Sequence, residues 1–318
     1  MRKVAILGAE LFEDQRELAL FGLTDIEATY YTCKDPLELV EQLSDVDGLI
    51  VNLEKVTSEL IARLGNLKVI GRYGVGVDNV NLKAATERHI AVINVPDYCV
   101  DEVAEHAVSF ILAANRKLFS SSALTKQGVW GKVKDLKPIQ SIKDITLGIV
   151  GTGRIGMKVI STMLPMGTQI LVYDPYLKQE NLPQGVTLVS LDQLLESSDI
   201  ISIHCPLTEQ TRYSFNAEAF QKTKRKPAII NVSRGPIIQE SALIEALDIG
   251  TISFAALDVM EIEPPPADHP LLNHPKAIVT NHIAWYSLQS EIKLRDLLVS
   301  RVIDYLNGEP VPSIVNKF

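Results

Sequence analysis

The sequence predicts an α/β protein of about two domains, each built on a parallel sheet. Two observations lead to this prediction. Short apolar runs alternate with segments of helical periodicity along most of the chain. Residues 145–174 read as a strand, a glycine-rich turn, a helix and a second strand. With 318 residues, the chain is long enough for two cores.

The glycine-rich turn has the GxGxxG spacing of a dinucleotide-binding unit. Its residues are Gly151, Thr152, Gly153, Arg154, Ile155 and Gly156. Gly151 allows a tight turn, Gly153 lets the backbone approach a pyrophosphate, and Gly156 lets the following helix pack against the strand. The amides at the start of that helix favour the phosphates. The alternative is a turn whose glycines only close a βαβ corner, and the strand–helix–strand context argues against it.

Asp174 ends the second strand of this unit. Its carboxylate can accept hydrogen bonds from both hydroxyls of an adenosine ribose. Its negative charge would repel the additional phosphate of NADP. We therefore expect NAD(H) as the cofactor, in preference to NADP(H).

Composition excludes several classes of protein. The net charge of −8 argues against a nucleic-acid partner. The three cysteines, Cys33, Cys99 and Cys205, contain no CxxC pair, so we expect neither disulfides nor a metal site. No apolar stretch approaches the length of a membrane span, and the N-terminal apolar run is too short for a signal peptide. These features predict a cytoplasmic protein without a membrane partner.

The first part of the chain predicts one parallel α/β domain. The expected strands are 4–7, 48–52, 67–70 and 91–94, and the expected helices are 36–44, 57–64 and 81–88.

The loop 72–80 follows one of these strands and contains alternating glycines. The amides of Val75 and Gly76 could converge on a carboxylate. A glycine-rich turn in which Asp78 and Asn79 cap the next helix is the alternative. We expect the capping, and the sequence of this loop leaves substrate binding open.

Residues 101–119 form the most apolar long helix, with Asp101 as the expected N-cap. Its apolar character predicts burial at an interface between domains or subunits. His106 in this helix is interpreted as a packed residue. Residues 120–142 read as an irregular connection.

Alternation resumes after residue 184. The expected strands are 188–189, 200–204, 228–232, 252–257 and 277–280, and the expected helices are 191–197, 217–222 and 241–247. Because ligands of a doubly wound sheet bind beyond the carboxyl ends of its strands, the residues that follow each strand are candidates for the site. They are His204, Cys205, Pro206, Ser233, Arg234, Gly235, Asp258, Asn281 and His282. A final helix, 287–307, is expected to pack back onto the N-terminal domain.

Two of these positions, together with Glu263 in the loop between them, predict acid–base chemistry. Arg234 could bind a substrate carboxylate and polarise a carbonyl, although a salt-bridged surface arginine is the alternative. His282 is suited to donate a proton near neutral pH. Glu263 could hold that imidazole in its protonated form, but its spacing alone favours a solvated loop acid.

These segments resemble the D-isomer-specific 2-hydroxyacid dehydrogenase family over essentially the whole chain. The segments that carry the resemblance are RYGVGVDNV, VGTGRIG with YDP, ISIHCPLT, IINVSRGP, ALDVMEIEP and NHIAWYS. The resemblance implies two Rossmann-like domains: a discontinuous, flavodoxin-like substrate domain (1–97 and 287–318) and an inserted, doubly wound NAD-binding domain (98–286).

The resemblance also implies roles for individual residues. The catalytic residues would be Arg234, Glu263 and His282. The substrate carboxylate would be held by Arg72 and by the amides of Val75 and Gly76. The cofactor site would include Gly151, Gly153, Arg154, Ile155, Gly156, Asp174, His204, Cys205, Pro206, Thr211, Val232, Ser233, Asp258 and His282. The implied activity is reversible reduction of a 2-oxo acid to a D-2-hydroxy acid with NADH, by a homodimer.

Within the family, the segments HIAWYS and NVPDYCVDEVAEH are similar to the branch of the C-terminal-binding proteins. That branch carries a tryptophan three residues after the histidine, here Trp285. This side chain would form a wall of the substrate pocket, and simple domain packing is the alternative. Asn281 departs from the proline that usually precedes the histidine. Two alternative functions stay open: an NAD(H)-responsive interaction protein of the corepressor kind with weak activity, and a phosphoglycerate dehydrogenase without a regulatory domain, for which Arg72 and Lys55 are slight support.

Overall fold

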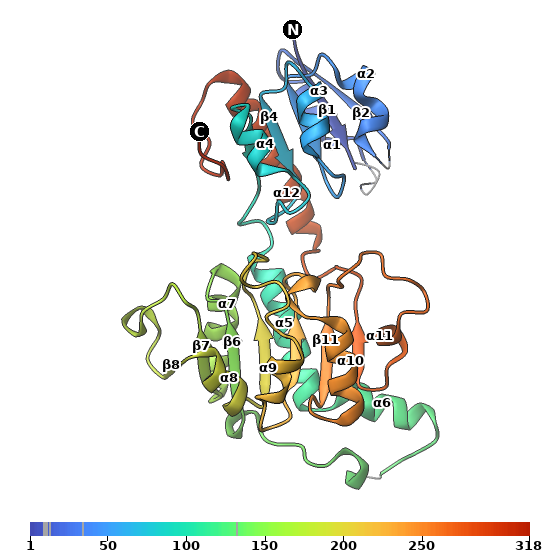
Figure 1. Cartoon of the computed structure of the whole chain (residues 1–318), viewed down its shortest axis with the longest axis vertical. Helices are drawn as coiled ribbons and strands as arrows, with labels where there is room; N and C mark the ends of the chain where they lie inside the picture. Colours follow the sequence, from blue (N-terminus) through green and yellow to red (C-terminus); the bar gives the residue numbers. More distant parts are fainter. Residues whose placement is uncertain (9–11, 13, 34, 132) are drawn as a thin grey trace. The chain divides into compact units, whose positions relative to one another are not determined.

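The chain folds into two compact units (Figure 1). The computed structural model describes residues 1–8, 12, 14–33, 35–131 and 133–318. Unit 1 consists of Met1–Cys99 and Tyr286–Phe318, and unit 2 consists of Val100–Trp285. The domain limits expected from the sequence differ slightly from these, and the roles assigned to the two domains stay predictions. Among the described helices, none combines the length and apolar composition that a membrane crossing requires.

Unit 1 contains a five-stranded sheet in which every pair is parallel. Its strands are β1 (Arg2–Leu7), β2 (Ile26–Tyr31), β3 (Gly48–Val51), β4 (Val69–Arg72) and β5 (Ala91–Ile93). The strand order β2-β1-β3-β4-β5 is that of the flavodoxin-like doubly wound fold. The predicted fold class is therefore confirmed for this unit.

Helices cover both faces of this sheet. They are α1 (Arg16–Phe21), α2 (Val40–Leu43), α3 (Ser58–Arg63), α4 (Leu82–Glu87) and α12 (Leu288–Asn307). The C-terminal helix α12 packs against α1 and β4, as expected for a tail that returns to the N-terminal domain. Sequence periodicity missed α1 and β2. The helix has only six residues, and β2 is an edge strand with one buried side chain, so neither carries a strong apolar pattern.

The predicted capping of α4 by Asp78 and Asn79 is wrong. The N-cap is Asn81, whose side chain accepts a hydrogen bond from the amide of Ala84. The amide group of Asn79 instead donates to the carbonyl oxygens of Asn52 and Glu54, at 3.0 and 2.8 Å. Asn79 therefore ties the loop after β3 to the loop after β4.

A buried ion pair joins the two ends of the chain within unit 1. The guanidinium of Arg295 in α12 donates two hydrogen bonds, of 2.7 and 2.6 Å, to the carboxylate of Glu17 in α1. The exposed fractions of these side chains are 1% and 0%. The hydroxyl groups of Tyr30 and Tyr73 donate to the same carboxylate. Burial would raise the pKa of Glu17, but the bonds from Arg295 and Tyr30 hold it below its usual value.

Unit 2 contains a seven-stranded parallel sheet. Its strands are β6 (Thr146–Val150), β7 (Gln169–Tyr173), β8 (Val186–Leu188), β9 (Ile200–Ile203), β10 (Ala228–Asn231), β11 (Phe254–Leu257) and β12 (Ala277–Val279). The order β12-β11-β10-β9-β6-β7-β8 reverses direction between β6 and β9. The sheet is thus doubly wound, and this reversal is its topological switch point.

The helices of unit 2 lie on both faces of the sheet (Figure 1). They are α5 (Val100–Asn115), α6 (Leu118–Lys126), α7 (Arg154–Met163), α8 (Leu191–Ser197), α9 (Ala217–Gln221), α10 (Glu240–Ile249) and α11 (Pro270–Asn273). The long helix α5 packs against α7 and the central strands. Buried side chains of α8, α9 and α10 join strands β9–β11 in an apolar core.

Two expectations for unit 2 are wrong. Helix α5 begins at Val100, so Asp101 lies inside its first turn and is not the N-cap. The carboxylate of Asp101 instead pairs with Lys158 at 2.6 Å. The expected irregular connection after the long helix contains a second helix, α6, which has no buried residues and therefore lacks an apolar stripe.

The buried pair in unit 1 predicts a large effect of Arg295→Met on stability. The substitution leaves the carboxylate of Glu17 buried without its cation, so we expect the free energy of unfolding to fall by about 3–5 kcal/mol. Denaturant titration of both proteins measures this difference. Arg63→Met is the matched control, because its partner Glu59 is exposed and such pairs contribute about 1 kcal/mol or less. Equal losses in the two variants would contradict the prediction.

Candidate active site

The glycine-rich turn lies at the switch point of unit 2, between the carboxyl ends of β6 and β9. Gly151 has a φ of +91°, and a Cβ there would lie 2.7 Å from the backbone nitrogen of Cys205. A Cβ on Gly156 would lie 2.2 Å from the carbonyl oxygen of Gly151. Both positions therefore require glycine for the fold itself. By contrast, a Cβ on Gly153 would meet no atom within 4 Å.

Open space at Gly153 fits the approach of a phosphate. Gly153 is the N-cap of α7, and Arg154 is the exposed first residue of that ten-residue helix. The helix N-terminus offers backbone amides and partial positive charge to an anion. Ile155 follows as a partly buried residue. The packing of the turn therefore does not require glycine at position 153, and the open space there is compatible with a bound phosphate.

Asp174 follows the carboxyl end of β7, beside this turn. One carboxylate oxygen accepts hydrogen bonds from the amide and the hydroxyl of Thr152, at 2.9 and 2.7 Å. The other accepts from the amide of Tyr176. Partial burial would raise the pKa of Asp174, but these three bonds keep it below its usual value. The side chain is therefore an anion held next to the glycine turn, as recognition of a ribose requires.

The segment after β9 forms the other wall of the switch point. The Nε2 atom of His204 lies 2.8 Å from the hydroxyl of Ser202, and burial lowers the pKa of His204 to about 4. Its ring is therefore neutral at physiological pH. Burial raises the pKa of the Cys205 thiol to about 11. The hydroxyl of Thr211 donates to the carbonyl oxygen of Pro206 at 2.7 Å and closes the following loop.

Arg234 lies on the loop after β10. The side-chain oxygen of Asn231 accepts from the amide of Ser233, and its amide group donates to the carbonyl oxygen of Arg234, each at 3.0 Å. A Cβ on Gly235 would lie 1.9 Å from the carbonyl oxygen of Met260, so the two loops are in direct contact there. Val232, at the start of this loop, is buried.

Glu263 and His282 form an ion pair close to this contact. The Nδ1 atom of His282 lies 2.6 Å from Oε2 of Glu263, and Oε1 accepts from the amide of Met260 at 2.9 Å. Burial would raise the pKa of Glu263, but His282, Met260 and the nearby charge of Arg234 hold it below its usual value. The carboxylate thus fixes the orientation of the imidazole ring. The structure brings Arg234, Glu263 and His282 together.

Asp258, after β11, is fully buried within unit 2. Its carboxylate accepts hydrogen bonds from the amides of Ile283 and Ala284, each at 2.9 Å. It also accepts from the hydroxyl of Thr280 at 2.5 Å. These bonds hold the loop that carries His282, so Asp258 contributes to the geometry of the site whether or not it also contacts a nicotinamide.

The residues expected to bind the substrate carboxylate lie in a different unit. A Cβ on Gly74 would overlap the guanidinium of Arg72, so that guanidinium folds over the glycine. The carbonyl oxygen of Val75 accepts a hydrogen bond of 2.6 Å from the side chain of Asn94, which fixes the peptide that joins Val75 to Gly76. Trp285 is the last residue of unit 2 and is partly buried. The carboxylate-binding role of this loop stays a prediction.

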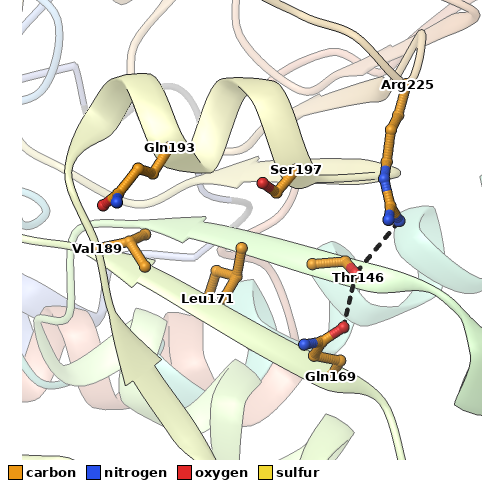
Figure 2. A pocket seen from close by; sticks show the side chains of 7 residues that line it. All are labelled: Thr146, Gln169, Leu171, Val189, Gln193, Ser197 and Arg225. Carbon is orange, nitrogen blue, oxygen red and sulfur yellow. Dashed lines mark hydrogen bonds between the residues drawn. The ribbon is translucent and has the colours of Figure 1, made fainter.

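A cavity of about 330 Å³ lies at the opposite edge of the sheet of unit 2 (Figure 2). Its lining residues are Thr146, Gln169, Leu171, Val189, Gln193, Ser197 and Arg225. Thr146 and Gln169 are the first residues of β6 and β7, so the cavity is at the amino ends of the strands. Figure 2 shows the hydrogen bonds that connect Thr146 to Gln169 and to Arg225. None of the residues predicted for catalysis or cofactor binding lines this cavity.

Among the described residues, no group of three or more His, Cys, Asp or Glu side chains could hold a metal ion. The site is instead composed of a guanidinium, an imidazole and carboxylates. Such groups can bind an acid, polarise a carbonyl and transfer a proton.

Sequence reasoning missed two residues that belong to this arrangement. Thr152 binds Asp174, and Thr280 binds Asp258. Thr280 follows the end of β12 directly, so the rule that singled out strand-end residues could have identified it. Thr152 lies inside the glycine motif as one of its variable positions, and nothing in the motif indicates its contact.

Comparisons with known proteins identify a family. Residues 108–284 match the family model described as the D-isomer specific 2-hydroxyacid dehydrogenase, NAD binding domain. The chain is 37% identical to D-3-phosphoglycerate dehydrogenase from Archaeoglobus fulgidus over 88% of its own length and 53% of that protein. It is 36% identical to glyoxylate reductase from Thermofilum pendens, over 88% of this chain and 84% of that protein.

Solved structures show the same fold. The structure of NAD-dependent formate dehydrogenase from Staphylococcus aureus in complex with NAD superimposes with a TM-score of 0.89, at 29% identity and over 99% of both chains. That of D-lactate dehydrogenase from Aquifex aeolicus with NAD and lactic acid gives 0.86, at 27% identity and over 96% of both chains. The chain spans about half the length of the D-3-phosphoglycerate dehydrogenase from Archaeoglobus fulgidus.

The open space at Gly153 predicts that Gly153→Ala weakens dinucleotide binding without unfolding the protein. The added methyl group would occupy the path of a pyrophosphate, so we expect the affinity for NADH to fall at least about tenfold. The stability should change by less than about 1 kcal/mol. Titration of NADH fluorescence and thermal unfolding measure the two quantities. Gly65→Ala is the control, since a Cβ there also meets nothing within 4 Å. Unchanged NADH affinity in Gly153→Ala would remove this turn from the cofactor site.

Proposed function

Because the chain belongs to the D-isomer-specific 2-hydroxyacid dehydrogenase family, we propose that it reduces a 2-oxo acid to a D-2-hydroxy acid with NADH. The observation that carries the proposal is the ion pair of 2.6 Å between His282 and Glu263, with Arg234 beside it. A protein that only binds a dinucleotide has no need of a proton donor held by a carboxylate.

The chain's own residues have separate roles in this reaction. Glu263 accepts from Nδ1 of His282, so Nε2 is the ring atom that gives its proton to the carbonyl oxygen of the substrate. Arg234 binds the carbonyl or carboxylate oxygens and stabilises negative charge that develops there. NADH, when bound, supplies the hydride for C2. After the proton has left, His282 takes up another proton from solvent for the next turnover, while Glu263 keeps the ring in place.

The substrate carboxylate is assigned to the loop after β4 in unit 1. Arg72 supplies a cation, and the amides of Val75 and Gly76 supply hydrogen-bond donors. Support comes from the bond between Asn94 and the carbonyl of Val75, which fixes the intervening peptide. Trp285 is proposed to wall the pocket.

Activity measurements with a panel of 2-oxo acids would identify the substrate. Relatives carry the names glyoxylate reductase, hydroxypyruvate reductase and D-3-phosphoglycerate dehydrogenase. A phosphorylated substrate would need further cations, for which Arg72 and Lys55 give only slight support. We therefore favour an unphosphorylated 2-oxo acid, and turnover of the phosphorylated one would identify the other activity.

We also propose that the chain belongs to the branch of the C-terminal-binding proteins. This assignment rests on the segments HIAWYS, which contains Trp285, and NVPDYCVDEVAEH. An NAD(H)-responsive interaction protein would bind NADH tightly and turn over no member of the panel. The proposed homodimer is tested by sedimentation of the purified chain.

The proton-donor role predicts a large loss of activity in His282→Asn. Asparagine tolerates the left-handed backbone at this position, where φ is +56°, but it cannot donate the proton. We expect the rate of 2-oxo acid reduction to fall by about 10²–10⁴-fold while NADH still binds. Steady-state kinetics and NADH titration provide the measurements. His89→Asn is the matched control, since φ there is +55°. Near-normal turnover in His282→Asn would refute the assignment.

The negative charge of Asp174 is expected to set the preference for NADH over NADPH. Asp174→Asn removes the charge that opposes an additional phosphate, so we expect the preference for NADH over NADPH to narrow by about tenfold or more. The ratio of kcat/KM for the two cofactors is the measurement, and Asp25→Asn in unit 1 is the control for a neutralised exposed acid. An unchanged ratio would show that Asp174 does not face the adenosine ribose.

A further inference from the structure

The backbone that carries the proton donor is strained and is held by one residue. His282 has a φ of +56°, in the left-handed region that side chains other than glycine rarely occupy. Its amide donates to the carbonyl oxygen of Asp258 at 2.9 Å. The next two amides, of Ile283 and Ala284, donate to the carboxylate of Asp258, each at 2.9 Å. Three consecutive amides thus bind Asp258, and these bonds compensate for the strained backbone of His282.

The carboxylate of Asp258 is oriented in turn by a pair of side chains. The hydroxyl of Thr280 donates to Oδ1 of Asp258 at 2.5 Å. The Nε2 atom of His106 in α5 lies 3.3 Å from the same hydroxyl oxygen and 3.9 Å from Oδ1. A threonine hydroxyl has a single hydrogen, so Thr280 donates to Asp258 and accepts from His106. His106 therefore carries its proton on Nε2, and its ring packs edge-on against Phe110.

We propose that Thr280 and His106 are positioning residues for the proton donor. This inference rests on the proposed function. His106 orients the hydroxyl of Thr280, Thr280 orients the carboxylate of Asp258, and that carboxylate holds the loop in which His282 faces Glu263. The route from α5 to the imidazole passes through hydrogen bonds of buried or partly buried groups, where a lost bond is not replaced by water without cost.

The geometry separates this role from simple packing. Thr280 could be replaced by valine, which has the same shape, without opening a cavity. Only the hydroxyl would be lost, and with it the bond that fixes one oxygen of Asp258. Small displacements of a catalytic group can cost about 10²-fold in rate even when the substituted residue does not touch the substrate.

The test compares Thr280→Val with Thr280→Ser in the full-length chain. We expect Thr280→Val to lower kcat for 2-oxo acid reduction by about ten- to a hundredfold, with the KM for the 2-oxo acid and the affinity for NADH close to those of the wild type. Thr280→Ser keeps the hydroxyl and should recover most of kcat. Wild-type kcat in Thr280→Val, or equal impairment of both variants, would overturn the proposal.

A second pair covers the case in which Thr280→Val does not fold. His106→Gln retains an N–H donor, whereas His106→Leu does not. We expect only His106→Leu to show a reduced kcat with an unchanged KM. Equal activity of the two variants would exclude His106 from the positioning role.

Amide hydrogen exchange distinguishes failure of this inference from failure of the proposed function. Loss of the hydroxyl should speed exchange at Ile283 and Ala284, because the carboxylate that accepts from both amides is no longer fixed, and at His282, which precedes them in the same loop. Exchange in unit 1 should stay constant. If the wild type turns over no 2-oxo acid, the proposed function fails, and exchange still decides whether Thr280 holds the loop. Unchanged exchange at these three amides would refute the positioning role.

Discussion

The parallel sheet of unit 2 is the constraint on which the candidate site depends. Strands β9, β10, β11 and β12 are paired in register, so their carboxyl ends lie side by side at one edge. Arg234, Asp258 and His282 follow three neighbouring strands and therefore meet, although they are distant in sequence. The glycine turn after β6 reaches the same edge, because β6 is the partner of β9. In an antiparallel sheet the same residues would alternate between opposite edges.

Three buried or partly buried carboxylates of this protein are stabilised in different ways. Glu17 is paired with the guanidinium of Arg295, a structural contact within unit 1. Asp258 is stabilised by amides and a hydroxyl, without a close guanidinium or ammonium partner among its hydrogen bonds. Glu263 is paired with His282. Amides and a hydroxyl thus supply to Asp258 the hydrogen bonds that a guanidinium supplies to Glu17.

The two ends of the sheet of unit 2 differ in chemistry. The cavity at the amino ends is bounded by amide, hydroxyl and apolar groups, and its guanidinium, that of Arg225, is already paired with Asp199 at 3.0 Å. The carboxyl ends carry the strained backbone of His282 and the ion pair with Glu263. Strain and a hydrogen-bonded pair of titratable groups are features of catalytic sites, whereas an open cavity alone is not.

The sequence by itself determined the fold class and indicated the strand-end residues of the candidate site in unit 2. The glycine spacing of 151–156 and the polar residues at strand ends are local features, and such features can be recognised in a sequence. Helices α1 and α6 and strand β2 were not predicted, because short or exposed elements carry little apolar periodicity. The pairing of Glu263 with His282 came only from a resemblance. The contact of His106 with Thr280 joins residues 174 positions apart. Only the tertiary structure determined this contact, because a hydrogen bond between side chains that are distant along the chain leaves no pattern in the sequence.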